Sequence, residues 1–192
     1  MKKSMLNVFM VLALGAVFCL PGMAMANLVV NGGFETGDMS GWTLYPAPDL
    51  PAFGIWGGAA HSGSYGCYFG AYGQYDDTIV QNIPTVAGNS YTFDFWLAHN
   101  DTDSANDFHV YWNGGEILSL INTASFGWTD YTFTEAATGA TTSITFAGRE
   151  VPAQYMLDDV DVNADAVHLP PTALLLGSGL LGLVGLGIFR KE

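Results

Sequence analysis

Basic side chains are scarce in this chain of 192 residues, which has five lysines and arginines against 18 aspartates and glutamates. Four of the five lie within three residues of an end, and only Arg149 lies in between. Residues 27–165 therefore carry one arginine and 17 acids, a formal charge of −16. A surface of this charge repels phosphate backbones, so the composition excludes nucleic acid as a partner.

The first 26 residues have the pattern of a secretory signal peptide. Lys2 and Lys3 form the charged start, residues 6–20 form an apolar core, and Ala24-Met25-Ala26 is an A-x-A cleavage site. Cleavage at this site predicts an exported protein whose mature chain begins at Asn27.

Cysteine is nearly absent, with Cys19 inside the signal segment and Cys67 beyond it. Removal of the signal peptide leaves a single thiol, which excludes an intramolecular disulfide even in an oxidising compartment. Because Cys67 lies in a strand-like run, we expect a buried, inert thiol, with a cross-linking thiol as the alternative.

No stretch of residues 27–165 shows the 3.6-residue apolar repeat of a helix. Short runs alternate between apolar and polar side chains instead, with turn residues between them. Asn113-Gly114 predicts a type I′ hairpin, because both central residues of that turn need positive φ. The pattern predicts one all-β domain, a β-sandwich over residues 27–165. The expected strands are Leu28–Val30, Trp42–Leu44, Gly54–Trp56, Gly66–Gly70, Thr78–Ile83, Tyr91–Ala98, Phe108–Trp112, Glu116–Leu120, Trp128–Thr134, Thr141–Gly148 and Tyr155–Val162.

Motifs of the common enzyme classes are missing. The chain contains no G-x-S-x-G, no H-E-x-x-H, no phosphate loop and no dinucleotide fingerprint. His61, His99 and His109 are scattered without metal-ligand spacing. We therefore expect a protein that is not an enzyme.

One long stretch at the C-terminal end has no charged residue. Residues 172–189 would span about 27 Å as a helix, close to the apolar thickness of a bilayer. Pro170-Pro171 precede the stretch, and Arg190-Lys191 follow it as cations suited to the cytoplasmic side. This pattern predicts a single transmembrane helix and hence contact with the membrane.

The residues around this helix resemble a PEP-CTERM sorting signal. Val167-His168-Leu169-Pro170 is followed by ALLLGSGLLGLVGLG and a terminal basic pair, although His168 and Leu169 stand where Pro-Glu is usual. The resemblance makes residues 166–192 a sorting tail and implies processing by an exosortase-type membrane enzyme. A sortase signal at 169–173 is the poorer alternative, since Ala173 replaces the glycine of that motif.

Residues 27–165 resemble the jelly-roll domains of galactose-binding and carbohydrate-binding-module type. The similarity lies in Asn27–Glu35 (NLVVNGGFE), Gly41-Trp42, Ser62–Gly66 (SGSYG) and the closing Tyr155–Val162 (YMLDDVDV). It implies a jelly-roll β-sandwich but leaves the ligand open, because many functions share these short motifs.

The same resemblance implies a structural calcium ion that joins the first and last strands. Its ligands would be Glu35, Asp158 or Asp159, and backbone carbonyls near Gly33 and Ser64. Two carboxylates and several carbonyls suit the hard oxygen shell of calcium, whereas no His and Cys cluster suits zinc. Strand alternation lets only one of the two consecutive aspartates face the ion, and we expect Asp158. Solvated carboxylates at strand ends are the alternative.

Residues 101–107 form an acidic loop, DTDSAND, which does not match a calcium-binding EF-hand. Ala105 cannot be a ligand, and Asn106 stands where the loop needs glycine. We expect a solvated loop.

Aromatic residues are numerous for a domain of this length. Sugar-binding modules stack pyranose faces on exposed rings, and the resemblance makes such rings candidate ligand residues. We expect exposure at Trp56 and at the turn that contains Tyr72, Gln74 and Tyr75, while core packing is the alternative for any single ring.

Together these features predict an exported protein that is anchored at the cell envelope or processed by an exosortase-type enzyme. The domain would be a non-catalytic binding or matrix module, with extracellular polysaccharide as its partner. A self-associating structural or adhesive protein is the main alternative. A small polysaccharide-degrading enzyme that uses paired carboxylates is the remaining one.

Overall fold

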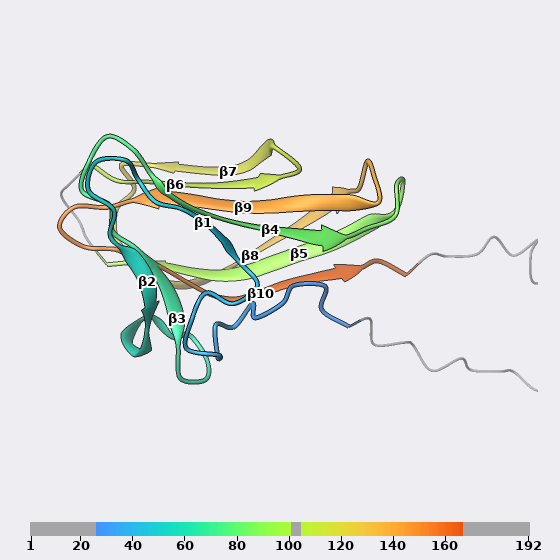
Figure 1. Ribbon diagram of the computed structural model, residues 1–192, viewed down its shortest axis with the longest axis horizontal. Helices are drawn as coiled ribbons and strands as arrows, with labels where there is room; N and C mark the ends of the chain where they lie inside the picture. Colours follow the sequence, from blue (N-terminus) through green and yellow to red (C-terminus); the bar gives the residue numbers. More distant parts are fainter. Residues whose placement is uncertain (1–25, 101–104, 167–192) are drawn as a thin grey trace, which may run out of the picture.

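The computed structural model describes residues 26–100 and 105–166, which form two five-stranded antiparallel sheets packed face to face (Figure 1). Sheet A has the order β1 (Thr43–Tyr45), β4 (Asp77–Pro84), β9 (Thr141–Arg149), β6 (Asp107–Trp112), β7 (Gly115–Ile121). Sheet B has the order β2 (Phe53–Trp56), β3 (Gly66–Phe69), β10 (Tyr155–Ala164), β5 (Ser90–His99), β8 (Phe126–Ala136). The single helical element in these ranges is the 3-10 turn η1 (Gly57–Ala59). The all-β prediction is confirmed.

The core lies between the two sheets and follows from strand alternation. In β5, for example, Tyr91, Phe93, Phe95 and Leu97 are buried, while the residues between them are only partly covered. The Phe95 ring meets Phe146 of sheet A edge to face, with centroids 5.1 Å apart. Burial of such a ring contributes about 2–3 kcal/mol, so these contacts hold the two sheets together.

Ten of the eleven predicted strands are present, with bounds that differ by two residues at most. The hairpin between β6 and β7 also agrees, since Asn113 and Gly114 have φ of 48° and 81°. The prediction of a buried thiol at Cys67 is confirmed as well.

The predicted strand at Leu28–Val30 is wrong. The chain there runs beside β10, but within the described residues only two backbone hydrogen bonds join them, from Leu28 N–H to the Val162 carbonyl and from Val160 N–H to the Gly32 carbonyl. The Asn27 side chain adds to these, since its Nδ2 donates to the Val160 carbonyl at 3.1 Å. Asn27 Oδ1 accepts from the backbone N–H of Val162 at 3.1 Å. Asn31 and Phe34 have positive φ and interrupt the extended backbone, so no regular ladder forms. Alternation alone could not reveal these side-chain contacts.

Two predicted segments lie outside the described residues. These are the signal peptide, except for Ala26, and the tail at 167–192, which holds the sorting motif and the transmembrane stretch. Within the described ranges, no helix has the length and apolar character needed to cross a membrane.

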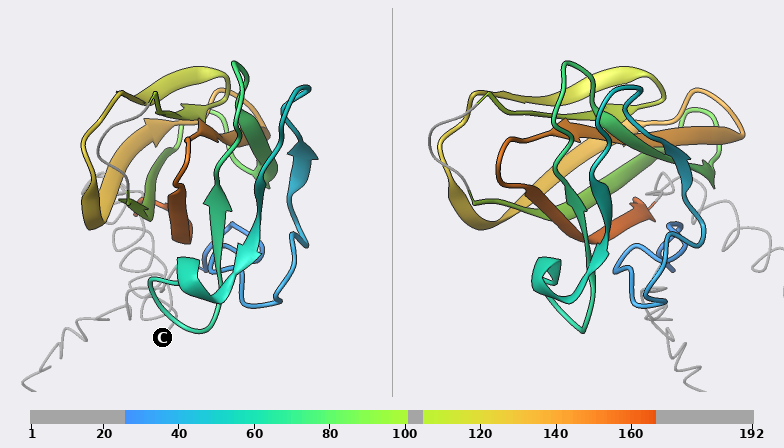
Figure 2. Two further views of the ribbon diagram at one scale, coloured as in Figure 1. Left: turned by 90° about the vertical axis from the view of Figure 1, so that its left-hand side faces the viewer. Right: turned by 60° about the vertical axis from the view of Figure 1, so that its left-hand side comes forward.

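The loop that joins β2 and β3, with η1 at its start, projects beyond the two sheets (Figure 2). Glu35 of the N-terminal segment and Asp158 of β10 contact this loop. The predicted ligand residue Tyr72 lies at the opposite end of β2 and β3.

Candidate functional site

Acidic side chains hold the loop between η1 and β3. Glu35 Oε1 accepts hydrogen bonds from the backbone N–H groups of Ser64 and Tyr65, at 2.8 and 2.9 Å. Asp158 Oδ2 accepts from His61 and Ser62 N–H, at 2.7 and 3.1 Å. We call this arrangement the acidic clamp; it joins the start of the chain, the loop at 61–65 and the last strand.

Asp159 belongs to the clamp as well. Its Oδ2 lies 2.7 Å from His61 Nδ1, and its Oδ1 accepts from Ser62 Oγ at 2.7 Å. The pairing of β10 with β5 shifts register between Asp158 and Asp161, and Asp159 has a φ of 49°. This β-bulge removes the alternation on which the choice of one aspartate rested, so both carboxylates reach the same loop.

The clamp residues fit a calcium ion in their chemistry. Around Gly33, a Cβ atom would lie 3.6 Å from Asp159 Oδ1, 3.9 Å from Asp158 Oδ1 and 3.9 Å from Glu35 Cγ. Two carboxylate oxygens, of Asp158 and Asp159, thus lie near a position that bears no side chain, while Glu35 approaches it with a methylene group. Asp158 is completely buried, and this burial raises its pKa to about 6 although three backbone N–H groups donate to it.

The clamp carboxylates do not converge on one point. Within the described ranges, one group of three acidic, His or Cys side chains has ligand atoms within 4.8 Å of one another, and none of its members belongs to the clamp. A calcium ion at the clamp would therefore need carbonyl oxygens, such as those near Gly33 and Ser64, to complete its six to eight ligands.

Trp56 lies at the edge of a surface cavity of about 400 Å³, together with Ile55, Tyr68 and Gln154. The indole is 52% exposed and its ring lies against Gly58, where a Cβ would overlap it. The phenol ring of Tyr68 lies beside Gly54 of the neighbouring strand, where a Cβ would be 3.4 Å from the ring. Two aromatic rings and an amide therefore surround one opening on the outside of sheet B.

Tyr68 and Gln154 were not among the predicted ligand residues. The signal for Tyr68 was available, because Cys67 before it and Phe69 after it are apolar and predict an outward position between them. Gln154 lies far away in the sequence and reaches the cavity through the pairing of β10 with β3.

The predicted turn residues are separated from Trp56. Tyr72 and Tyr75 are exposed, at 48% and 57%, which agrees with the expectation for these rings. However, Trp56 pairs with Gly66 at one end of the β2–β3 ladder, whereas the Tyr72 N–H donates to Leu50 beyond the other end. The four predicted ligand residues therefore do not form a single site.

The turn at 72–75 is held by charged groups. Asp49 Oδ2 accepts from the Gln74 N–H at 2.9 Å, and Arg149 Nη1 donates to the Gly73 carbonyl at 3.4 Å. Asp77 is completely buried and binds the N–H groups of Ala47 and Ala52 through its two oxygens. These bonds fix the two loops at this end of the sandwich.

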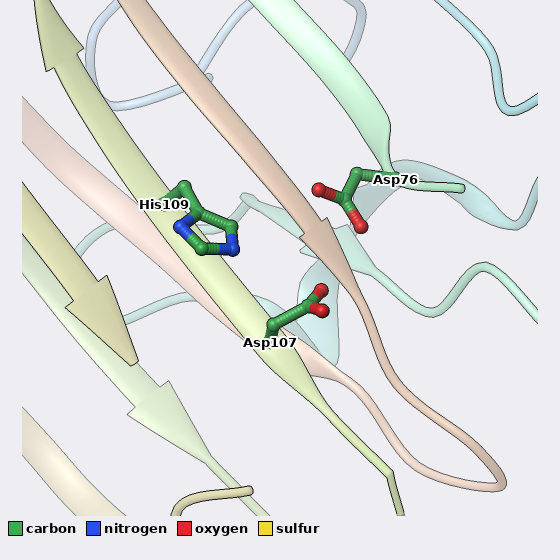
Figure 3. Close-up of side chains that lie close together, drawn as sticks. All are labelled: Asp76, Asp107 and His109. Carbon is green, nitrogen blue, oxygen red and sulfur yellow. The ribbon is translucent and has the colours of Figure 1, made fainter. Parts of the chain in front are cut away.

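A second polar group lies next to this turn, on the outside of sheet A. Asp76, Asp107 and His109 point toward one another across β9 (Figure 3). Burial raises the pKa of Asp76 to about 7, and the neighbouring Asp107 carboxylate adds to the rise. The sequence analysis missed this group because Asp76, just before β4, lies about 30 residues away in the chain from Asp107 and His109 of β6.

Comparison with known proteins identifies the fold. No protein-family model matches the sequence, and no curated protein matches it. Among solved structures, the TmCBM61 module in complex with β-1,4-galactotriose is similar, with a TM-score of 0.56 and 19% identity over 73% of this chain and 99% of the module. The domain is a jelly-roll β-sandwich.

Two further structures have the same fold. The K1 cleaved adhesin domain of Lys-gingipain from Porphyromonas gingivalis W83 gives a TM-score of 0.54 at 17% identity, over 70% of this chain and 96% of that domain. The CBM22-1 xylan-binding domain of Xyn10C from Paenibacillus barcinonensis gives 0.50 at 12% identity, over 71% and 94%. At these identities the likeness concerns the fold alone.

Proposed function

We propose that this protein is a non-catalytic carbohydrate-binding module that recognises polysaccharide outside the cell. The observation that carries the proposal is the half-exposed indole of Trp56, which shares a cavity with Tyr68 and Gln154. The jelly-roll fold it shares with carbohydrate-binding modules is in keeping with this function, although fold alone does not assign it.

The chemistry of the cavity suits a sugar ring. A pyranose has one apolar face of C–H groups that packs on an aromatic ring, and hydroxyls at its edge that need hydrogen-bond partners. Trp56 and Tyr68 offer the rings, and the Gln154 amide offers both a donor and an acceptor. A volume of about 400 Å³ lies within the range of small-molecule sites.

In this proposal calcium has a structural role at the acidic clamp. Glu35, Asp158 and Asp159 would supply carboxylate oxygens, and carbonyls near Gly33 and Ser64 would complete the shell. The ion would hold the loop at 61–65 against the last strand. Since η1 and Trp56 directly precede this loop, calcium would also steady the sugar site.

The proposal includes export and attachment. The signal-like start and the PEP-CTERM-like tail would bring the domain to the cell envelope, where an exosortase-type enzyme would process the tail. Cell fractionation tests this part. A chain that ends at Asp165 should leave the membrane fraction in which the full chain is found, and its retention there would contradict the proposed anchor.

A polysaccharide-binding screen on the purified protein, with calcium and with a chelator, tests the central claim. We expect selective binding that Trp56→Ala removes while the thermal midpoint stays unchanged. If the folded protein binds no glycan, the proposal is wrong. Sedimentation would then test the alternative of a self-associating adhesive protein, since a cleaved adhesin domain shares the fold.

A further inference from the structure

The register of sheet A places the members of the second polar group side by side. Asp107 of β6 pairs with Arg149 of β9, and Asp77 of β4 pairs with Gly148, so Asp76 lies beside Arg149 on the other side of β9. His109 pairs with Ala147, one outward-facing position further along β9. Because Ala147 is small, the side chains on either side of β9 can approach each other over it.

The three side chains meet as a compact set of ligand atoms. One atom from each of Asp76, Asp107 and His109 lies within 4.8 Å of the other two. Figure 3 shows both carboxylates and one ring nitrogen of His109 directed into the same space. They come from β6 and from the residue just before β4, elements that are held in place by their hydrogen bonds to β9.

The other ring nitrogen of His109 is engaged outside this space. Nδ1 lies 2.6 Å from Glu116 Oε1 and 3.2 Å from Ser119 Oγ, both on β7. A carboxylate beside Nδ1 favours the tautomer with the proton on Nδ1, which leaves a lone pair on Nε2. The three atoms that face one another are thus all electron-pair donors.

Asp107 supplies an independent observation. The residue is 8% exposed, and its Oδ1 is buried without a hydrogen-bond partner in the part of the chain that the structure describes. Its Oδ2 is paired with Arg149 Nη2 at 2.6 Å. A buried carboxylate oxygen without a partner is costly, and a proton or a cation in the shared space would satisfy it.

The charges leave room for a cation. Arg149 is the only lysine or arginine in the described ranges, and it balances one of the three negative charges of Asp76, Asp107 and Glu116. Its Nε lies 3.5 Å from Asp76 Oδ1 and its Nη2 lies 2.6 Å from Asp107 Oδ2, so the guanidinium contacts both carboxylates of the group. A divalent ion that displaces the proton of Asp76 would balance the two remaining negative charges.

We propose that Asp76, Asp107 and His109 bind a divalent transition-metal ion such as Zn²⁺, with Glu116 orienting the imidazole. The donor set of one imidazole nitrogen and two carboxylates suits Zn²⁺ and Co²⁺, whereas calcium prefers oxygen ligands alone. The ion would tie the turn at 72–75 to β6 across the end of β9. This site is separate from the acidic clamp and from the sugar cavity, and does not depend on the proposed function.

Titration of the untagged full chain with Co²⁺, followed by visible absorption, tests the site. We expect one equivalent of Co²⁺ to bind with a ligand-field band that Zn²⁺ abolishes and Ca²⁺ leaves unchanged. Asp107→Asn and His109→Gln should each weaken binding at least tenfold. Glu116→Gln should weaken it about tenfold, because it acts through the imidazole.

His61→Gln is the matched control, because His61 also contacts a carboxylate, that of Asp159, but lies at the clamp. It should bind Co²⁺ as the wild type does. Thermal unfolding shows that each variant is folded, and Zn²⁺ should raise the midpoint of the wild type and of His61→Gln but not of His109→Gln.

Three outcomes would overturn the proposal. The wild type could show neither a Co²⁺ band nor a Zn²⁺-dependent midpoint, in which case the two aspartates share a proton instead. His109→Gln could bind as tightly as the wild type. His61→Gln could abolish binding, which would move the ion to the clamp.

Discussion

The imidazole Nε2 of His99 lies 2.5 Å from Oε2 of Glu150, and both side chains are completely buried. The pair joins the end of β5 to the segment that follows β9, and the ring of Tyr155 stacks on His99 with centroids 4.3 Å apart. Burial of a polar pair at the end of the core makes each partner dependent on the other.

Glu150→Ala should therefore lower the free energy of unfolding by about 3–5 kcal/mol, because it leaves a buried imidazole without its acceptor. Chemical denaturation of the wild type and the variant measures the difference. Glu135→Ala, at a partly exposed acid on β8, is the control and should change stability by less than about 0.5 kcal/mol. Equal effects of the two substitutions would show that the buried pair contributes nothing specific.

A second prediction concerns pH and the outside of sheet B. Burial raises the pKa of Asp94 to about 6, and the charges of Asp161 and Asp130 add to the rise. In the unfolded chain this carboxyl has its ordinary pKa of 3.8, so the folded state binds the proton more tightly. The contribution of Asp94 to the free energy of unfolding should therefore increase as the pH falls from about 7 to about 4.

Asp94→Asn removes the unfavourable charge and should stabilise the protein at pH 7.5. The gain should be no more than about 1 kcal/mol, because the carboxyl is partly exposed and solvent screens it. At pH 4 the variant and the wild type should be equally stable. Thermal midpoints at both pH values measure this, and a variant less stable than the wild type at pH 7.5 would contradict the prediction.

We expect Trp56 to make the main contact with the sugar through the face of its indole ring. Trp56→Ala should lower affinity for a polysaccharide found in the screen at least tenfold, and isothermal titration measures the loss. Tyr45→Ala is the control, since this ring is equally exposed but lies on β1 in the other sheet. Equal losses in the two variants would indicate non-specific contact.

Gly58→Ala tests the same ring without removing it. A Cβ at this position would overlap the Trp56 indole, so the ring must leave its place against the backbone. We expect weaker sugar binding together with a shifted tryptophan fluorescence spectrum and a thermal midpoint close to that of the wild type. Unchanged affinity would place the sugar elsewhere.

Calcium removal should loosen the acidic clamp. In the wild type, addition of calcium should raise the thermal midpoint, and a chelator should reverse the rise. Glu35→Ala should lose this response, because it removes one ligand and also the acceptor for the N–H groups of Ser64 and Tyr65. A variant with unchanged melting and an unchanged calcium response would contradict a calcium site at Glu35.

Much of the fold follows from local pattern. The alternation in Tyr91–Leu97 predicts both the strand and the side that it buries, and Asn113-Gly114 predicts the hairpin, because these signals depend only on neighbouring residues. The wrongly predicted strand at Leu28–Val30 also has a physical explanation. Two backbone hydrogen bonds and those of the Asn27 side chain take the place of a regular ladder there, and apolar periodicity does not predict them.

The candidate site was predictable only in part. Short motifs pointed to Glu35, Asp158 and Asp159, and the structure brings all three to the loop at 61–65. The bulge that turns both aspartates toward this loop was not predictable, because it arises from the register between β10 and β5. Exposure at Trp56 was expected, but its distance from the turn at 72–75 was not.

The sequence by itself determined ten of the strands, the buried side of β5, the strong negative charge and the aromatic content. Apart from the β6–β7 hairpin, the tertiary structure alone decided which strands are neighbours. It therefore decided that Asp76, Asp107 and His109 meet across β9 while Trp56 and Tyr72 stay apart. The physical reason is that the direction of a side chain is a local property of its strand. Contact between strands depends instead on hydrogen bonds and packing between segments that lie far apart in the chain.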